Sequence, residues 1–139
     1  MARKLSPKTA NAKKAYLWIR IVVPDGGAIG PGKIDLLRAI GDAQSISAAA
    51  REMDMSYRRA WMLLDETRKA INAEVIETHA GGADRGGATL TAAGKELIAA
   101  YERISAVANA AVANDLKKIG TAPVPRSKKA AKTRARAAS

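Results

Sequence analysis

The hydrophobic and polar positions of residues 45–71 predict a short helix, a tight turn and a longer helix. We expect the first helix at Ala48–Met53 with Ser47 as its N-cap, because a serine hydroxyl accepts a free backbone N–H at a helix start. The longer helix then begins after Ser56 and ends near Ile71. Two helices joined by so short a turn are typical of a helix-turn-helix, whose second helix enters the DNA major groove.

The longer helix has one apolar face and one basic face. At about 100° per residue, its apolar face comprises Tyr57, Ala60, Trp61, Leu64, Thr67 and Ile71, which we expect to pack against the core. The other face presents Arg58, Arg59 and Met62, and guanidinium groups there can bind guanine edges or phosphates. Asp65 and Glu66 follow and would repel phosphate, so we expect only the first two turns to contact DNA. A solvated basic face is the alternative.

A glycine-rich stretch follows this helix and separates two short apolar segments. Val75–His79 and Ala88–Leu90 predict two strands, and the loop between them contains four glycines. A hairpin beside a recognition helix would form a wing, in which Gly82, Arg85 and Gly86 can approach the DNA backbone closely. The alternative is a hairpin that makes no contact with DNA.

The last apolar pattern predicts one long helix that begins at Thr91 and ends near Ile119. Its apolar positions, spaced alternately four and three residues apart, are Leu97, Tyr101, Ile104, Ala108 and Ala111. Roughly 28 residues at about 1.5 Å each give about 42 Å, which is longer than the core of so small a domain needs. We therefore expect a homodimer interface here, with two recognition helices on half-sites about 34–36 Å apart. A helix that only covers its own domain is the alternative.

The residues before the helix-turn-helix predict a strand at Tyr16–Val23 and a helix at Lys33–Asp42, closed by Gly41. Between them, Gly27–Lys33 matches the glycine and lysine spacing of a phosphate-binding loop. However, Ile34 stands where that motif needs Ser or Thr to hold magnesium. We therefore expect a tight loop here, and a nucleotide hydrolase is disfavoured.

The net charge of +11 lies entirely at the two ends of the chain. Residues 1–16 hold five cations and residues 121–139 hold six, without any acid, whereas residues 17–120 are neutral. Basic tails of this kind bind nucleic acid or serve solubility alone. The expected organisation is a disordered basic arm (1–15), one domain (16–119) and a disordered basic tail (120–139).

The residue types that are missing exclude several classes of protein. The chain has no cysteine and a single histidine, so we expect no metal site, no cofactor and no catalytic residues. It has no apolar run of 18 residues and no secretory signal, so we expect no membrane partner. These features fit a cytoplasmic, nucleoid-associated protein that is not an enzyme.

Three motifs in order carry a resemblance to a known family: GKIDLLRAIGDAQSISAAAREMDMSYRRAW, the glycine-rich wing, and LTAAGKELIAAY. Over about residues 17–110 they closely resemble the winged helix-turn-helix of the molybdate-responsive regulators, the ModE family. The LT-x-AG helix entry is similar, more distantly, to LysR-type DNA-binding domains. The resemblance implies a mainly α fold with a small β-wing, followed by a long C-terminal dimerisation helix.

The same resemblance implies a homodimeric transcriptional regulator bound to double-stranded DNA. Family DNA contacts match Ser56, Tyr57, Arg58, Arg59 and Met62 and the wing segment Gly82–Gly86. Full-length members continue into a molybdate-binding region of small β-barrel repeats, where this chain has its basic tail. We therefore expect a stand-alone DNA-binding domain without molybdate sensing or another small-molecule effector. The alternative is a nucleoid-associated architectural protein whose basic tails drive binding to DNA.

Overall fold

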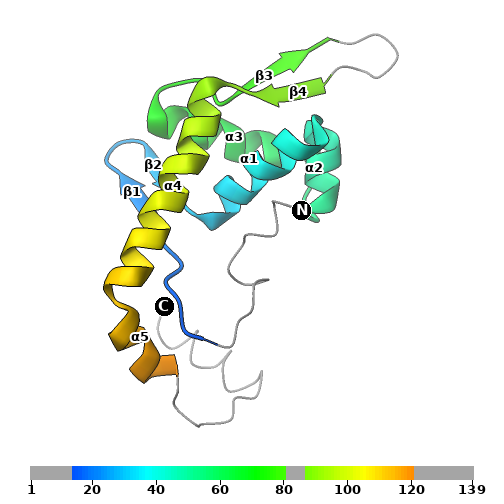
Figure 1. The fold of residues 1–139 in the computed structure, drawn as a ribbon. Helices are drawn as coiled ribbons and strands as arrows, with labels where there is room; N and C mark the ends of the chain where they lie inside the picture. Colours follow the sequence, from blue (N-terminus) through cyan, green and yellow to red (C-terminus); the bar gives the residue numbers. More distant parts are fainter. Residues whose placement is uncertain (1–13, 81–86, 121–139) are drawn as a thin grey trace.

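The computed structural model describes residues 14–80 and 87–120. These residues form five helices and two antiparallel pairs of strands, so the described chain is mostly helical with a small β component, as expected. In chain order the elements are β1 (Ile21–Val23), β2 (Gly27–Ile29), α1 (Pro31–Ala43), α2 (Ile46–Glu52), α3 (Tyr57–Ile71), β3 (Ile76–His79), β4 (Gly87–Leu90), α4 (Ala92–Ala111) and α5 (Ala113–Gly120). Figure 1 shows α4 along one side of the molecule and the β3–β4 pair at the end where α4 begins.

Some sequence predictions lie outside the described residues. The wing positions Gly82, Arg85 and Gly86 belong to this group, as do the basic arm and tail apart from residues 14, 15 and 120. Within residues 14–80 and 87–120, no helix is long and apolar enough to cross a membrane. The same residues contain no group of three or more His, Asp or Glu side chains that could hold a metal ion.

The main hydrophobic core lies between α1, α2, α3 and the β3–β4 pair. Its buried side chains include Leu36, Leu37 and Ile40 from α1, Leu64 from α3 and Val75 just before β3. Burying a side chain of this size contributes about 1.5–3 kcal/mol, so this cluster is the main source of stability. It fixes α3 against α1 and α2 and leaves the opposite side of α3 exposed.

A second, smaller core joins β2, α1 and α4, and it explains why the predicted strand Tyr16–Val23 is wrong over its first half. Only Ile21–Val23 pairs with another strand, namely Gly27–Ile29. The preceding backbone is bound by side chains of α4 instead: Leu17 N donates to Asn109 Oδ1 at 2.7 Å, and Tyr101 Oη donates to Ile19 O at 2.5 Å. Because these groups are satisfied by α4, the segment needs no partner strand.

The glycine loop that resembles a phosphate-binding loop has a structural role. Its first residues form β2 instead of the expected loop, and α1 begins at Pro31. The lysine of the motif is occupied, because Lys33 Nζ donates to Ala28 O at 2.6 Å and lies 3.1 Å from Glu66 Oε1. Lys33 therefore ties β2, α1 and α3 together.

The expected end of α1 at Gly41 is wrong. The helix continues to Ala43, and Gln44 caps it in the left-handed conformation, with φ of 57° and its N–H bonded to Ile40 O at 2.7 Å. Gly41 is small for a different reason. A Cβ at this position would lie 2.9 Å from Leu90 Cδ1, so the glycine lets α1 approach β4 closely.

The long C-terminal helix begins as expected but is divided in two. Thr91 caps α4, and its Oγ1 accepts a hydrogen bond from Gly94 N at 3.0 Å. The helix ends at Val112 after 20 residues, about 30 Å, and the short helix α5 follows. At the end of α5, Gly120 packs so closely on Ala15 that an added Cβ would lie 2.8 Å from Ala15 N. The chain therefore turns at Val112 towards its own N-terminal segment.

Candidate nucleic-acid interface

The two helices predicted as a helix-turn-helix are present as α2 and α3, but α2 begins earlier than expected. Ser45, and not Ser47, is the N-cap, and its Oγ accepts a hydrogen bond from Ala48 N at 3.0 Å. The turn between the helices contains Asp54 in the left-handed conformation, with φ of 57°. Aspartate tolerates this conformation better than most residues, which explains how so short a turn forms without glycine.

The start of α3 lies where the sequence predicts it. Ser56 Oγ accepts a hydrogen bond from Arg59 N at 2.9 Å, so Ser56 caps the helix. Arg58, Arg59 and Met62 are exposed together on one side of the first two turns, which we call the basic face. Neither guanidinium forms an ion pair with any residue of the described chain. The basic face is therefore free to bind an anionic partner.

The prediction that Tyr57 and Trp61 pack into the core is wrong. Tyr57 is 53% exposed and Trp61 is 39% exposed, and their rings meet edge to face with centroids 6.3 Å apart. The buried stripe of α3 is centred on Ala60, Leu64 and Thr67. At about 100° per residue, the two aromatic residues stand roughly 60–100° from the middle of this stripe. They therefore lie at its edge, beside the basic face.

The acidic residues of α3 are paired with cations of the same chain. Asp65 Oδ1 accepts a hydrogen bond from Arg68 at 2.7 Å, and Lys69 lies 3.2 Å from the other oxygen. The hydrogen bond from Arg68, with that from Lys69, lowers the pKa of the Asp65 carboxyl below its ordinary value. Glu66 is paired with Lys33. These pairs lower the net negative potential in the later turns of α3, but they also occupy its cations, so binding of an anion is left to the first two turns.

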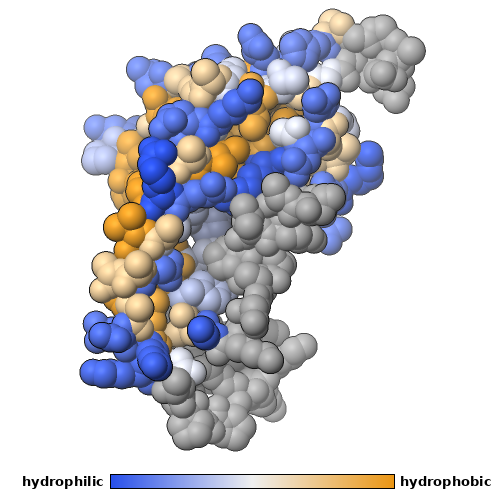
Figure 2. All heavy atoms as spheres, in the orientation of Figure 1, coloured by the Kyte–Doolittle hydropathy of each residue, from blue (hydrophilic) through white to orange (hydrophobic). Residues whose placement is uncertain are grey.

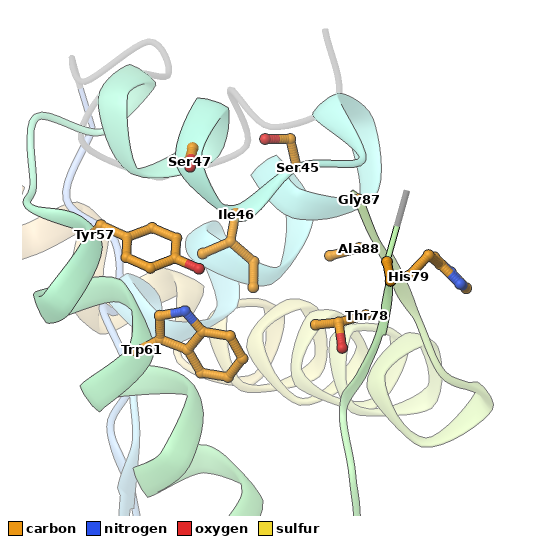
Figure 3. Close-up of a pocket in the computed structure, with 10 residues that line it drawn as sticks. Ser45, Ile46, Ser47, Tyr57, Trp61, Thr78, His79, Gly87 and Ala88 are labelled. Carbon is orange, nitrogen blue, oxygen red and sulfur yellow. The ribbon is translucent and has the colours of Figure 1, made fainter. Parts of the chain in front are cut away.

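An open groove of about 360 Å³ lies between the start of α2, the first two turns of α3 and the β3–β4 pair. Its walls include Ile46 and Ser47 from α2, Tyr57 and Trp61 from α3, and Thr78 and Ala88 from the two strands. Figure 3 shows both rings directed into the groove and the side chain of His79 pointing away from them. Among the described residues, no Asp, Glu, Lys or Arg lines it. The sequence predictions missed this groove because they placed Trp61 in the core.

The residues predicted as a dimer interface are divided between two roles. Tyr101 is buried, and Leu97 packs against both hydrophobic cores, so these two side chains serve the chain's own fold. Ile104 is 45% exposed, and Val107, one turn from it and not among the predicted residues, is 68% exposed. Figure 2 shows hydrophobic residues gathered on this side of the molecule, along α4. Ala108 is partly exposed and Ala111 is exposed. An unpartnered apolar face therefore remains on the second half of α4.

Comparison with known proteins identifies relatives that are named for molybdenum. No protein-family model matches the chain. The molybdenum-pterin-binding protein MopB of Rhodobacter capsulatus is 46% identical over 81 residues, which is 58% of this chain and 30% of that protein. The molybdenum transport protein ModE of Herbaspirillum seropedicae is 42% identical over 69 residues, 50% of this chain and 26% of that protein.

A third relative is a regulator by name. The DNA-binding transcriptional dual regulator ModE of Escherichia coli K12 is 34% identical over 77 residues, 55% of this chain and 29% of that protein. The matched part of the chain thus spans less than a third of the length of each of these three relatives. The similarity therefore concerns one portion of a longer protein in each case.

Proposed function

We propose that this chain is a DNA-binding transcriptional regulator of the molybdate-responsive type and not an enzyme. In this proposal α2 and α3 are a helix-turn-helix, and the β3–β4 pair is the base of a wing. The observation that carries it is the basic face at the start of α3, where Arg58 and Arg59 are exposed and unpaired within the described chain. The named function of the regulator from Escherichia coli supports the same reading.

The chemistry of α3 limits how DNA would bind. The N-terminus of a helix carries a partial positive charge, which attracts phosphate and adds to the charge of the two arginines. A guanidinium group presents two parallel donors to the O6 and N7 atoms of guanine. The cations of the later turns are engaged by Asp65 and Glu74, whereas Arg58 and Arg59 are not. We therefore infer that the first two turns of α3 enter the major groove.

We further propose that the regulator is a homodimer, joined through the second half of α4. Ile104 and Val107 form an apolar face there that nothing in the described chain covers. Ala108 and Ala111 lie beside them and allow close approach of a second helix. Two copies would present two α3 helices to half-sites about one helical turn apart, about 34–36 Å.

The test is selection of genomic DNA fragments by the full-length chain in competition with random duplex, repeated over a series of salt concentrations. We expect a subset of fragments to be enriched and to share a pseudo-palindromic sequence. Equal binding of all sequences would contradict the proposal. Molybdate is included in a parallel series, because three relatives are named for molybdenum. We expect no effect of molybdate on binding to the selected fragments.

A second candidate function, an architectural DNA-binding protein, is favoured by the position of the chain ends. Because Ala15 and Gly120 are in contact, both basic terminal segments start from one place on the molecule, next to α5. Eleven cations without any acid therefore attach near one point. If they dominate binding, affinity for random duplex should equal that for genomic fragments and should fall steeply with salt. Enrichment of particular fragments would count against this alternative.

A further inference from the structure

The groove beside α3 has walls of neutral hydrogen-bond donors and aromatic rings. The hydroxyls of Tyr57 and Thr78 and the indole N–H of Trp61 all belong to exposed side chains that line it. Among the described residues, none of the three has a hydrogen-bond partner. The two rings also expose apolar surface that a partner would cover. The groove can therefore receive a ligand that has both acceptor oxygens and an apolar portion.

The position of the groove identifies such a ligand. Tyr57 directly precedes Arg58 in the first turn of α3, so a duplex that contacts the basic face must pass the mouth of the groove. Pockets for small molecules bury most of the ligand surface, whereas this groove is open along its length. No carboxylate among the described residues lines it, so a polyanion meets no repulsion there. These features favour a nucleic-acid strand over a small molecule.

Resting on the proposed function, we propose that this groove holds the sugar–phosphate backbone of one DNA strand. The Tyr57 and Thr78 hydroxyls and the Trp61 N–H donate to phosphate oxygens, and the two rings contact the deoxyribose. Arg58 and Arg59 then read the bases of the same half-site. The groove thus sets the depth and angle at which α3 lies in the major groove, since backbone contacts fix orientation and base contacts fix sequence.

Neutral donors give this site a signature that separates it from the arginines. A cation that neutralises a phosphate releases a counterion, so its loss reduces the slope of log K against log salt by about one. A hydroxyl that donates to a phosphate neutralises no charge. Its loss should weaken binding by a factor that is the same at every salt concentration.

The experiment uses the full-length chain and a duplex selected in the genomic-fragment assay. The double variant Tyr57→Phe/Thr78→Val removes two hydroxyls with almost no change of shape. Tyr16→Phe/Thr89→Val is the matched control, because Thr89 lies on the other face of the strand pair from Ala88. We expect about tenfold weaker binding for the groove variant, with an unchanged salt slope, and no change for the control. Binding equal to that of the control, or a slope changed by about one, would overturn the proposal.

A second measurement locates the contact on the DNA. Single methylphosphonate substitutions replace one charged phosphate oxygen by a methyl group, and we expect one or two positions per half-site to weaken binding by the wild-type chain. At those positions the groove variant should lose less affinity than the wild type, because its donors are already absent. Equal losses in both chains at every position would contradict the assignment.

A third measurement does not depend on variants at the groove. In a Trp18→Phe background, the fluorescence of Trp61 should change on addition of the selected duplex, since the ring would become covered. An unchanged spectrum at saturating duplex would also overturn the proposal. If the wild-type chain selects no duplex at all, the proposed function fails and this inference fails with it. If it selects a duplex and only the groove variants and Trp61 are unaffected, this inference alone fails.

Discussion

Gly94 lies so close to the carbonyl oxygen of Val75 that no Cβ could be placed between them. The same carbonyl accepts a hydrogen bond from Thr91 N at 3.0 Å, and Thr91 Oγ1 donates to Glu74 O at 2.6 Å. The first turn of α4 is therefore fixed to the segment that leads from α3 into β3. Because this segment also sets where the β3–β4 pair stands relative to α3, the contact between Gly94 and Val75 helps to shape the candidate DNA-binding surface.

This contact predicts that Gly94→Ala destabilises the protein. Alanine is normally favoured over glycine inside a helix by about 1 kcal/mol. Here the added methyl group would push α4 away from Val75, and overpacking of this kind costs about 1–3 kcal/mol. Gly32→Ala is the matched control, because it lies in α1 and an added Cβ there meets nothing within 4 Å. Denaturant unfolding should show a loss for the first variant and none for the second, and equal stabilities would refute the packing argument.

Tyr101→Phe should lower stability at neutral pH by about 1 kcal/mol, because it removes the hydrogen bond to Ile19 O. Burial raises the pKa of the Tyr101 hydroxyl above its ordinary value of 10.0. In alkaline solution the unfolded chain therefore loses this proton first and the folded chain keeps it, so the contribution falls as pH rises through the folded pKa. The stability gap between wild type and variant should narrow above about pH 10.

The control for this prediction is Tyr57→Phe, which removes an exposed hydroxyl and should leave the free energy of unfolding unchanged at neutral pH. Unfolding curves recorded between neutral pH and pH 11 measure both effects. A gap between wild type and Tyr101→Phe that stays constant or widens above pH 10 would contradict the role assigned to the buried hydroxyl.

The sequence predicts the helices of this fold well because their signals are local. Serine and threonine caps stand at Ser56 and Thr91, and the apolar spacing defines the buried stripe of α3 around Leu64. The wrong predictions all depend on contacts between distant residues. Tyr16–Val23 alternates like a strand, yet its first half binds to Asn109 and Tyr101, which are more than 80 residues away. Periodicity cannot reveal that partner.

The candidate site shows the same division. The exposure of Arg58 and Arg59 follows from their position opposite the apolar stripe, and the sequence predicts it correctly. The exposure of Tyr57 and Trp61 does not, because a large aromatic residue at the edge of a stripe can turn either into the core or out of it. Only the placement of the β3–β4 pair across from α3 shows that these rings line a groove.

Arg58→Ala and Arg59→Ala should each weaken binding to the selected duplex by about 1–3 kcal/mol and relax the sequence preference. The reason is that each removes a guanidinium for which nothing else in the described chain can substitute on the basic face. Arg103→Ala is the matched control, since it removes an exposed arginine that pairs with Glu96 on α4. Competition binding against random duplex measures both effects. Retention of the wild-type preference by the double variant Arg58→Ala/Arg59→Ala would refute α3 as the reading helix.

Val107→Glu should dissociate the proposed homodimer without unfolding the chain. Val107 is 68% exposed, so a carboxylate there stays in water in the single chain, but it would be buried without a partner between two α4 helices. Burying an unpaired charge costs several kcal/mol, and each 1.4 kcal/mol weakens association about tenfold. Ala106→Glu adds the same charge at another exposed position, about 100° away around α4, and should leave association unchanged. Sedimentation velocity distinguishes the two variants, and a Val107→Glu chain that remains dimeric would show that α4 is not the interface.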